Sequence, residues 1–415
     1  MGRTISTHFR SMTDIPIDPR LYINTNAPFS AVVCGVQGSG KSHTVSVMLE
    51  NMLVPDCPSI GSLKKALSGL VLHLSEGGPS SLPNEAAWLS VPSRLGLKTP
   101  KVCVYVSHAS LNTMRTVYAP LGKRVIVEPL LFTEAELDAQ AFLSMMAVGS
   151  SDSAPLYIQI VLSILRDLGE NYTFQAFMRN LETSKKKFNP AQLSGLEQRL
   201  SLLTSFMEKG HSSKQQKPRF APGQITIVDL SDPFIDSASA CGLFEIITRL
   251  FVRADVSTGK VLVVDEAHKY LSSTRGSSGL TGALLALTRQ QRHLSMRVII
   301  STQEPTVVPP VLLDLCTVTI LHRFSSPSWW DHLIKHVSAD FTGSDVFNKV
   351  VRLQTGQAIV LAPSAIGIFD EAVVSSAVAP NPKTLSQFGR RYLIMKTRRR
   401  VTADGGASVL VLDTK

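Results

Sequence analysis

Residues 35–42 read GVQGSGKS and fit the phosphate-loop pattern G-x-x-x-x-G-K-S in full. An apolar run, FSAVVCG (29–35), precedes the string, and a helix-like segment, HTVSVMLENML (43–53), follows it. Glycines let backbone N–H groups close around phosphate oxygens, and the start of a helix directs the positive end of its dipole at the same anion. The pattern predicts that Lys41 reaches the β- and γ-phosphates and that the Ser42 hydroxyl is a ligand of Mg²⁺. The expected nucleotide contacts are Gly35, Val36, Gln37, Gly38, Ser39, Gly40, Lys41, Ser42 and His43.

Apolar runs of the kind that form buried strands recur along the chain and alternate with helical patterns. Strands that alternate with helices build a parallel sheet through crossover connections. The sequence therefore predicts an α/β fold with a mainly parallel sheet flanked by helices. The expected strands lie at 29–35, 70–75, 101–107, 124–130, 224–232, 260–268, 296–303, 316–324 and 356–364.

Two acidic residues follow one of these apolar runs in KVLVVDEAHKYL (260–271). A buried strand that ends in two acids beside a P-loop is typical of a Walker B motif. In that role Asp265 holds Mg²⁺ through water near Ser42, and Glu266 orients and polarises the water that attacks the γ-phosphate. The next run, MRVIISTQ (296–303), ends in Gln303, and an amide at that strand end senses the γ-phosphate or positions the water.

The string D-E-A-H at 265–268 also raises the hypothesis of a superfamily 2 helicase. Two motifs of that class are missing from the sequence. No S-A-T string follows the acidic pair, and no Q-x-x-G-R-x-G-R string occurs near the end. We therefore reject the helicase interpretation.

The P-loop together with DEAHKYL (265–271), TRQQRH (288–293) and IISTQEP (299–305) resembles the HerA–FtsK superfamily of DNA-pumping ATPases. The similarity extends over residues 29–365, although only the motif stretches are specific. It implies a RecA-like P-loop ATPase core that uses ATP and Mg²⁺. It also implies a hexameric ring with ATP sites between subunits and DNA in the central pore. The P-loop begins at residue 35, so the sequence contains no recognisable counterpart of that family's N-terminal barrel or membrane domains.

The resemblance further implies an arginine that one subunit supplies to the site of its neighbour, from a position ahead of the sensor strand. Such an arginine stabilises negative charge at the γ-phosphate in the transition state. In LTRQQRHLSMR (287–297), Arg292 is the first candidate and Arg289 the second. Arg297 and Arg323 are further candidates, and a solvated or DNA-facing side chain is the alternative for each of them.

A block of helical periodicity separates the two groups of expected strands. Thr133 and Glu136 form a capping box, and Asn189 followed by Pro190 is typical of another helix start. We therefore expect an all-helical insertion within the core. The expected division is an irregular N-terminal arm (1–28), a first core part (29–131), the helical insertion with a basic linker (132–220), a second core part with Walker B and sensor (221–380) and a basic C-terminal tail (381–415).

The composition is that of a globular protein, with 44% hydrophobic residues, 18% charged residues and a net charge of +10. The charge favours an anionic partner, either a nucleic acid or a membrane surface, and a basic soluble protein without such a partner is the alternative that charge alone leaves open. DNA is the partner we expect. Five scattered cysteines without a C-x-x-C pair indicate reduced thiols in an intracellular protein, with nucleus and cytoplasm both open. No apolar run reaches transmembrane length.

Some basic and terminal stretches have more than one interpretation. Met1–Ser6 fits the loose N-myristoylation pattern. The run Arg398–Arg400 fits a nuclear localisation signal, a phosphate contact or a solvated tail. Lys185–Lys187 and the linker lysines 209, 214 and 217 are candidates for contacts with a DNA backbone, and a solvated helix end is the alternative for the triple lysine.

The motifs together lead to one main functional hypothesis and two alternatives. The main hypothesis is ATP hydrolysis coupled to DNA translocation or pumping by a ring oligomer. The first alternative is a nucleotide-gated assembly or regulatory ATPase that moves nothing. The second is a domesticated mobile-element or viral packaging-type ATPase with an altered role.

Overall fold

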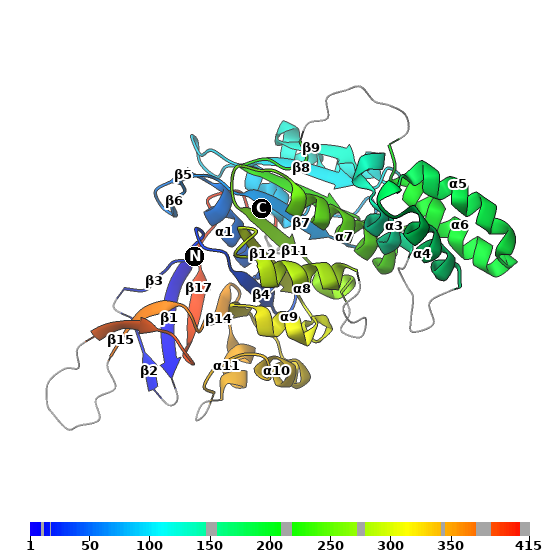
Figure 1. Cartoon of the computed structure of the whole chain (residues 1–415). Helices are drawn as coiled ribbons and strands as arrows, with labels where there is room; N and C mark the ends of the chain where they lie inside the picture. Colours follow the sequence, from blue (N-terminus) through cyan, green and yellow to red (C-terminus); the bar gives the residue numbers. More distant parts are fainter. Residues whose placement is uncertain are drawn as a thin grey trace, which may run out of the picture.

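The computed structural model describes residues 1–9, 12–16, 18–146, 156–208, 218–271, 279–341, 345–370 and 383–406 (Figure 1). In this part of the chain, 13 strands form one sheet in the order β2-β1-β17-β14-β13-β4-β12-β11-β7-β10-β8-β9, with β3 paired to β1. The neighbours from β13 to β9 all pair in parallel. The parallel strands are β4 (Ser30–Cys34), β7 (Ser68–His73), β8 (Lys101–Val106), β9 (Val125–Pro129), β10 (Gln224–Asp229), β11 (Lys260–Val264), β12 (Met296–Thr302) and β13 (Val318–Leu321).

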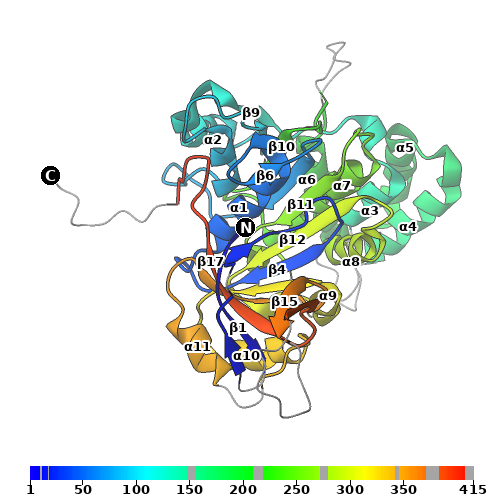
Figure 2. The ribbon, with the colours of Figure 1, turned by 90° about the vertical axis from the view of Figure 1, so that its left-hand side faces the viewer.

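Helices cover both faces of this sheet, as Figure 2 shows. Side chains alternate between the faces along each strand. Ala31 and Val33 of β4 pack in a core with α1 (Lys41–Leu53), α2 (Leu111–Tyr118) and η1 (Glu85–Ser90). Val32 and Cys34 pack in a second core with α7 (Ser237–Arg253), α8 (Leu280–Gln290) and α9 (Pro310–Leu315). The expected α/β fold with a mainly parallel sheet is confirmed, and all nine expected strands are present with small shifts at their ends.

In the described residues between β9 and β10, four α-helices extend from one end of the sheet (Figure 1). They are α3 (Ala139–Met146), α4 (Leu156–Leu168), α5 (Phe174–Ser184) and α6 (Pro190–Ser205). The capping box of Thr133 and Glu136 is present, but it begins a short turn, η3 (Glu134–Glu136), and the helix proper starts later at Ala139. Lys185 pairs with Glu182 at 2.6 Å, so its charge is partly neutralised within the helical block. The linker lysines 209, 214 and 217 lie outside the described residues.

The expectation of an irregular N-terminal arm is wrong. Residues Gly2–Phe9 form β1, which pairs antiparallel with β17 (Tyr392–Thr397) and also with β2 (Met12–Asp14) and β3 (Arg20–Leu21). The strand carries no apolar alternation, because it buries the polar residues Ser6, Thr7 and His8. His8 is satisfied by Ser6 and stacks on Tyr392 with ring centroids 4.8 Å apart. A strand whose partner lies almost 400 residues away and whose buried face is polar escapes detection by hydrophobic pattern.

The described part of the expected basic tail, residues 383–406, is likewise not a free tail, and we call it the C-terminal stretch. Besides β17, it contributes β16 (Lys383–Gln387), which pairs with β15 (Ile366–Asp370), and β17 continues the main sheet through β14 (Gln357–Leu361). The side chain of Arg398 bonds Glu50 of α1, and the buried Arg400 bonds Glu85 at 2.8 Å. These two guanidinium groups are therefore engaged inside the fold, whereas Arg399 is exposed.

The remaining elements are short and connect the main ones. They are β5 (Asp56–Cys57), β6 (Gly61–Ser62), α10 (Pro327–Ile334), α11 (Val346–Arg352), η2 (Ala119–Arg124), η4 (Gly169–Asn171), η5 (Lys185–Lys187), η6 (Ala267–Lys269) and η7 (Pro305–Val307).

All five cysteines are free thiols. Within the described ranges no helix is both long and apolar enough to cross a membrane.

The fully buried carboxylate of Glu50 ties the P-loop helix to the C-terminal stretch. Its Oε1 accepts hydrogen bonds from the backbone of Val401 and Thr402 and from the Thr402 hydroxyl, at 2.7–2.9 Å, and its Oε2 accepts one from Arg398 at 2.5 Å. We expect Glu50→Ala to lower the free energy of unfolding by about 3–5 kcal/mol, because it leaves a guanidinium and several donors without their buried partner. Urea unfolding followed by fluorescence measures this loss.

The exposed ion pair between Asp18 and Arg20 supplies the matched control, because it also joins a carboxylate to a guanidinium at 2.6 Å. We expect Asp18→Ala to change stability little, since water screens an exposed pair. Similar losses for Glu50→Ala and Asp18→Ala would contradict this account of the buried carboxylate.

Candidate nucleotide-binding site

Three parallel strands end at one edge of the sheet and direct the motif residues there. The P-loop follows β4, Asp265 and Glu266 follow β11, and Gln303 follows β12, which lies between the other two. Because parallel strands share their carboxyl edge, these segments meet although they are far apart in sequence. The sheet thus brings together all three motifs that the sequence analysis selected.

The backbone of the P-loop has the shape that its glycines permit. Gly40, the residue before α1, has φ 108°, and a Cβ there would lie 2.9 Å from the Cα of Gly356. No side chain caps the first turn of α1, so its N–H groups point into the loop without a side-chain acceptor. Ser39 closes the loop by donating from its hydroxyl to the Val36 carbonyl at 2.7 Å. This arrangement is a cradle of backbone donors for an anion.

Lys41 is buried at the start of α1 and faces both acids of the Walker B segment. Its Nζ donates to the Val36 carbonyl at 3.2 Å. Burial lowers the pKa of Lys41, and the nearby carboxylates of Glu266 and Asp265 act in the opposite direction. The two acids are thus close enough to act on the Lys41 charge, at the edge of the sheet where β4 and β11 end.

Glu266 has a left-handed backbone and a side chain that contacts the sensor residue. Its φ of 50° is unusual for a residue with a Cβ and costs on the order of 1–2 kcal/mol. The Gln303 amide nitrogen donates to Glu266 Oε2 at 3.1 Å, and His268 Nδ1 lies 3.3 Å from the same oxygen. Burial, the largest effect, lowers the pKa of His268. The glutamate expected to polarise the water and the expected sensor are therefore in direct contact.

Asp265 is held by two side chains that the sequence analysis did not select. His73 Nδ1 and Asn84 Nδ2 each lie 3.0 Å from Asp265 Oδ2. Burial alone would raise the pKa of Asp265, but the bonds from His73 and Asn84 and the charge of His73 outweigh it and keep that pKa below its usual value. His73 ends the apolar run of β7, a strand-end signal that was available in the sequence; Asn84 lies in a loop and offered none.

The donor set suits a hard cation such as Mg²⁺, which prefers oxygen ligands and keeps several waters. The Ser42 hydroxyl lies in the first turn of α1, and Asp265 Oδ1 receives neither the His73 nor the Asn84 bond. Ser42 and Asp265 are thus the residues that fit a magnesium ion here.

Two histidines beside the P-loop have structural partners. The ring of His43 bonds the Arg398 carbonyl at 2.8 Å and the Asp404 carboxylate at 3.2 Å, so it points to the C-terminal stretch, although its backbone belongs to the first turn of α1. The fully buried His322 bonds Thr44 at 3.0 Å and the Gln357 carbonyl at 2.9 Å. Burial lowers the pKa of His322 to about 4, so its neutral ring supports α1 from beneath.

The candidate arginines lie at different edges of the sheet. Because β11 and β12 are parallel neighbours, α8 must return the chain to the amino edge, where the strands begin. The exposed Arg289 lies in the last turn of α8, and the exposed Arg292 follows that helix. They are therefore on the opposite side from the P-loop of their own chain. Arg297 is buried and donates to the carbonyls of Ser295 and Thr25, which excludes it as a mobile finger. Arg323 is exposed beside the P-loop, and its carbonyl accepts from Val36 N at 2.9 Å.

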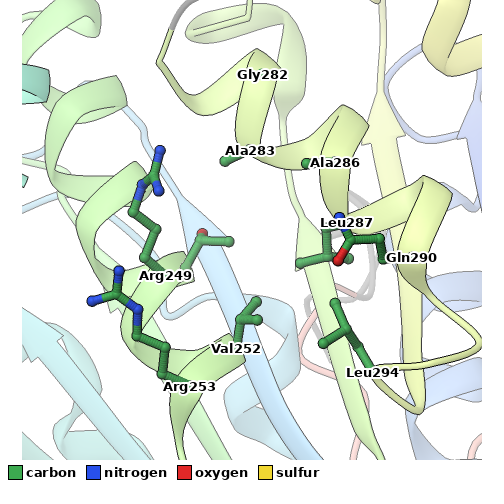
Figure 3. A pocket seen from close by; sticks show the side chains of 10 residues that line it. Arg249, Val252, Arg253, Gly282, Ala283, Ala286, Leu287, Gln290 and Leu294 are labelled. Carbon is green, nitrogen blue, oxygen red and sulfur yellow. The ribbon is translucent and has the colours of Figure 1, made fainter. Parts of the chain in front are cut away.

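A groove of about 220 Å³ lies between α7 and α8, on the face of the sheet that α1 does not cover (Figure 3). Val252 of α7 and Ala283, Ala286 and Leu287 of α8 give it an apolar lining. The arginines on its α7 side are paired, Arg249 with Glu245 and Arg253 with Asp138, both at 2.7 Å. The groove is separate from the nucleotide-binding site.

The strand order and the placement of the motifs define a RecA-like P-loop NTPase fold. No protein-family model and no curated protein matches the sequence. Solved structures with a similar fold include VirB4 of Thermoanaerobacter pseudethanolicus, at 12% identity over 96% of this chain and 98% of that one, with a TM-score of 0.46.

Two other solved structures are similar in the same way. The bacterial conjugative coupling protein TrwBdeltaN70 is 14% identical over 94% of this chain and 89% of its own, with a TM-score of 0.47. The genome packaging NTPase B204 from Sulfolobus turreted icosahedral virus 2, in complex with AMPPCP, is 12% identical over 81% of this chain and 92% of its own, with a TM-score of 0.33. At such identities and scores the likeness assigns no activity to this chain.

Proposed function

We propose that this protein hydrolyses ATP and couples hydrolysis to the translocation or pumping of DNA as a ring oligomer. The observation that carries the hydrolytic part is the contact between Glu266 and Gln303 at 3.1 Å, opposite Lys41 at the same edge of the sheet. A carboxylate and an amide in contact beside a phosphate loop have the geometry needed to hold one water for in-line attack.

The P-loop and its neighbours divide the work between binding and chemistry. Backbone N–H groups of the P-loop, other than that of Val36, which donates to Arg323, bind the phosphate oxygens. The Lys41 ammonium offsets the charge of the β- and γ-phosphates. Ser42 and Asp265 hold Mg²⁺, which neutralises charge on those oxygens when it is bound. Glu266 accepts a hydrogen bond from the attacking water and polarises it. Gln303 fixes the positions of the Glu266 carboxylate and of the water.

The proposed coupling to DNA rests on the net charge, and the proposed ring rests on the positions of two arginines. A net charge of +10 favours a polyanionic partner. Arg292 and Arg289 lie at the sheet edge away from their own P-loop, so only the site of another subunit is within their reach in a ring. We propose Arg292 as the residue that reaches the neighbour's γ-phosphate and Arg289 as the second candidate.

The test is the ATPase rate of the full chain with and without duplex DNA, paired with the mass of the ATP-bound Glu266→Gln oligomer. We expect DNA to stimulate hydrolysis several-fold and the mass to correspond to a ring. Stimulation that fades with rising salt would agree with phosphate contacts. Slow hydrolysis that is indifferent to nucleic acid, with assembly switched by ATP, would contradict translocation and support a nucleotide-gated assembly role.

A further inference from the structure

A largely buried polar network, which includes the Walker B aspartate, connects three neighbouring strands. Asp265, His73 and Asp229 lie at the carboxyl ends of β11, β7 and β10, which are adjacent in the sheet. His73 and Asp229 are register partners on adjacent parallel strands. His73 thus lies between two carboxylates and donates to one of them, Asp265, at 3.0 Å.

The orientation of Asn84 in this network is determined by its other bonds. Asn84 Oδ1 accepts from the backbone of Ala86 at 2.9 Å and caps η1. Its Nδ2 is therefore the atom that faces Asp265 Oδ2, at 3.0 Å. Asn84 N donates to the Tyr118 hydroxyl, which in turn donates to Asp229 at 2.7 Å. Asn84, Tyr118 and Asp229 are buried. The His73 and Asp265 side chains are 14% and 15% exposed, so the network has limited freedom to rearrange.

We infer that His73 and Asn84 are positioning residues for the magnesium site: they hold Oδ2 of Asp265 and leave Oδ1 for the water shell of the metal. This inference rests on the proposed function, because it assigns Asp265 to Mg²⁺. Two donors on one oxygen prevent rotation of the carboxylate, which would otherwise form a direct bond to Lys41 or another donor. The Tyr118–Asp229 pair supports Asn84 from the far side.

The experiment measures ATPγS binding by calorimetry, once in Mg²⁺ and once in EDTA, so hydrolysis and DNA do not enter. Asn84→Ser retains a capping oxygen for η1 and removes the amide donor. His73→Leu removes the imidazole donor, and His73→Asn keeps a side-chain N–H close to the same place. Mg²⁺ is expected to raise the ATPγS affinity of the unaltered chain. We expect Asn84→Ser and His73→Leu to reduce this gain about 10-fold and to leave the affinity in EDTA unchanged. His73→Asn is expected to restore most of the gain.

Two results would overturn the inference. One is an Asn84→Ser variant that melts at the same temperature as the unaltered chain and whose ATPγS affinity depends on Mg²⁺ to the same extent. The other is an equal loss of affinity in Mg²⁺ and in EDTA, which would assign these residues a general structural role. If His73→Leu does not fold, Asn84→Ser still decides the question. Failure of the proposed function is a separate result, since it appears as hydrolysis by the unaltered chain that DNA does not stimulate.

Discussion

Glu266→Gln is expected to bind ATP as tightly as the unaltered chain and to hydrolyse it at least about 100-fold more slowly. Glutamine keeps the size of the side chain and an oxygen near Gln303, so the geometry of the site persists. What is lost is the negative charge that polarises the attacking water. Steady-state phosphate release measures the rate, and calorimetry with ATPγS measures the binding.

Lys41→Ala is the control that separates binding from chemistry. Lys41 is buried against the phosphate loop, and its removal takes away the cation that offsets the nucleotide charge. We expect this variant to lose nucleotide affinity together with activity, whereas Glu266→Gln loses activity alone. A Glu266→Gln variant that hydrolyses ATP within a few-fold of the unaltered rate would remove Glu266 from the catalytic role.

Arg292→Ala is expected to reduce ATP hydrolysis by about 1,000-fold without weakening ATP binding to its own P-loop. The reason is position: the side chain is exposed near the amino edge of the sheet, on the far side from its own phosphate loop. In the proposed ring, a guanidinium at this position would act on the site of another subunit. Arg289→Ala, three residues earlier in the last turn of α8 and also exposed, is the matched comparison and is expected to retain most activity.

Mixing subunits distinguishes action between chains from action within one chain. Arg292→Ala has an intact P-loop, and Lys41→Ala has an intact Arg292. A mixed ring therefore contains some complete sites, and we expect the mixture to be more active than either variant alone. If mixing recovers nothing while Arg323→Ala abolishes activity, the arginine acts within its own chain, since Arg323 lies beside its own P-loop.

The contact between Gln303 and Glu266 also suggests why the two residues act together. Glu266 has a strained backbone, with φ 50°, and its side chain is held by a neighbour from β12. Strain of this kind persists only where the surroundings determine the conformation. The amide of Gln303 contacts the Glu266 carboxylate directly, so we expect the proposed sensor and the proposed base to act as one unit.

Local sequence was sufficient for much of this protein. The P-loop, the Walker B acids and the sensor glutamine each follow a buried apolar strand, and such strands are visible as short apolar runs. Alternation with helices predicted the parallel sheet, and a parallel sheet aligns the carboxyl ends of its strands. The meeting of Lys41, Asp265, Glu266 and Gln303 therefore follows from patterns that lie within a few residues of each motif.

Only the tertiary structure decided the features that depend on distant partners. β1 buries polar residues, and its partner β17 is at the other end of the chain, so no local pattern revealed it. In the sequence, the basic run at 398–400 was compatible with a solvated tail. In the structure, Arg398 of this run pairs with the buried carboxylate of Glu50. Asn84 became a neighbour of Asp265 only through the packing of η1 against the sheet. Apolar periodicity records which residues are buried, but not which polar groups meet there, because a hydrogen bond requires a particular partner at a particular distance.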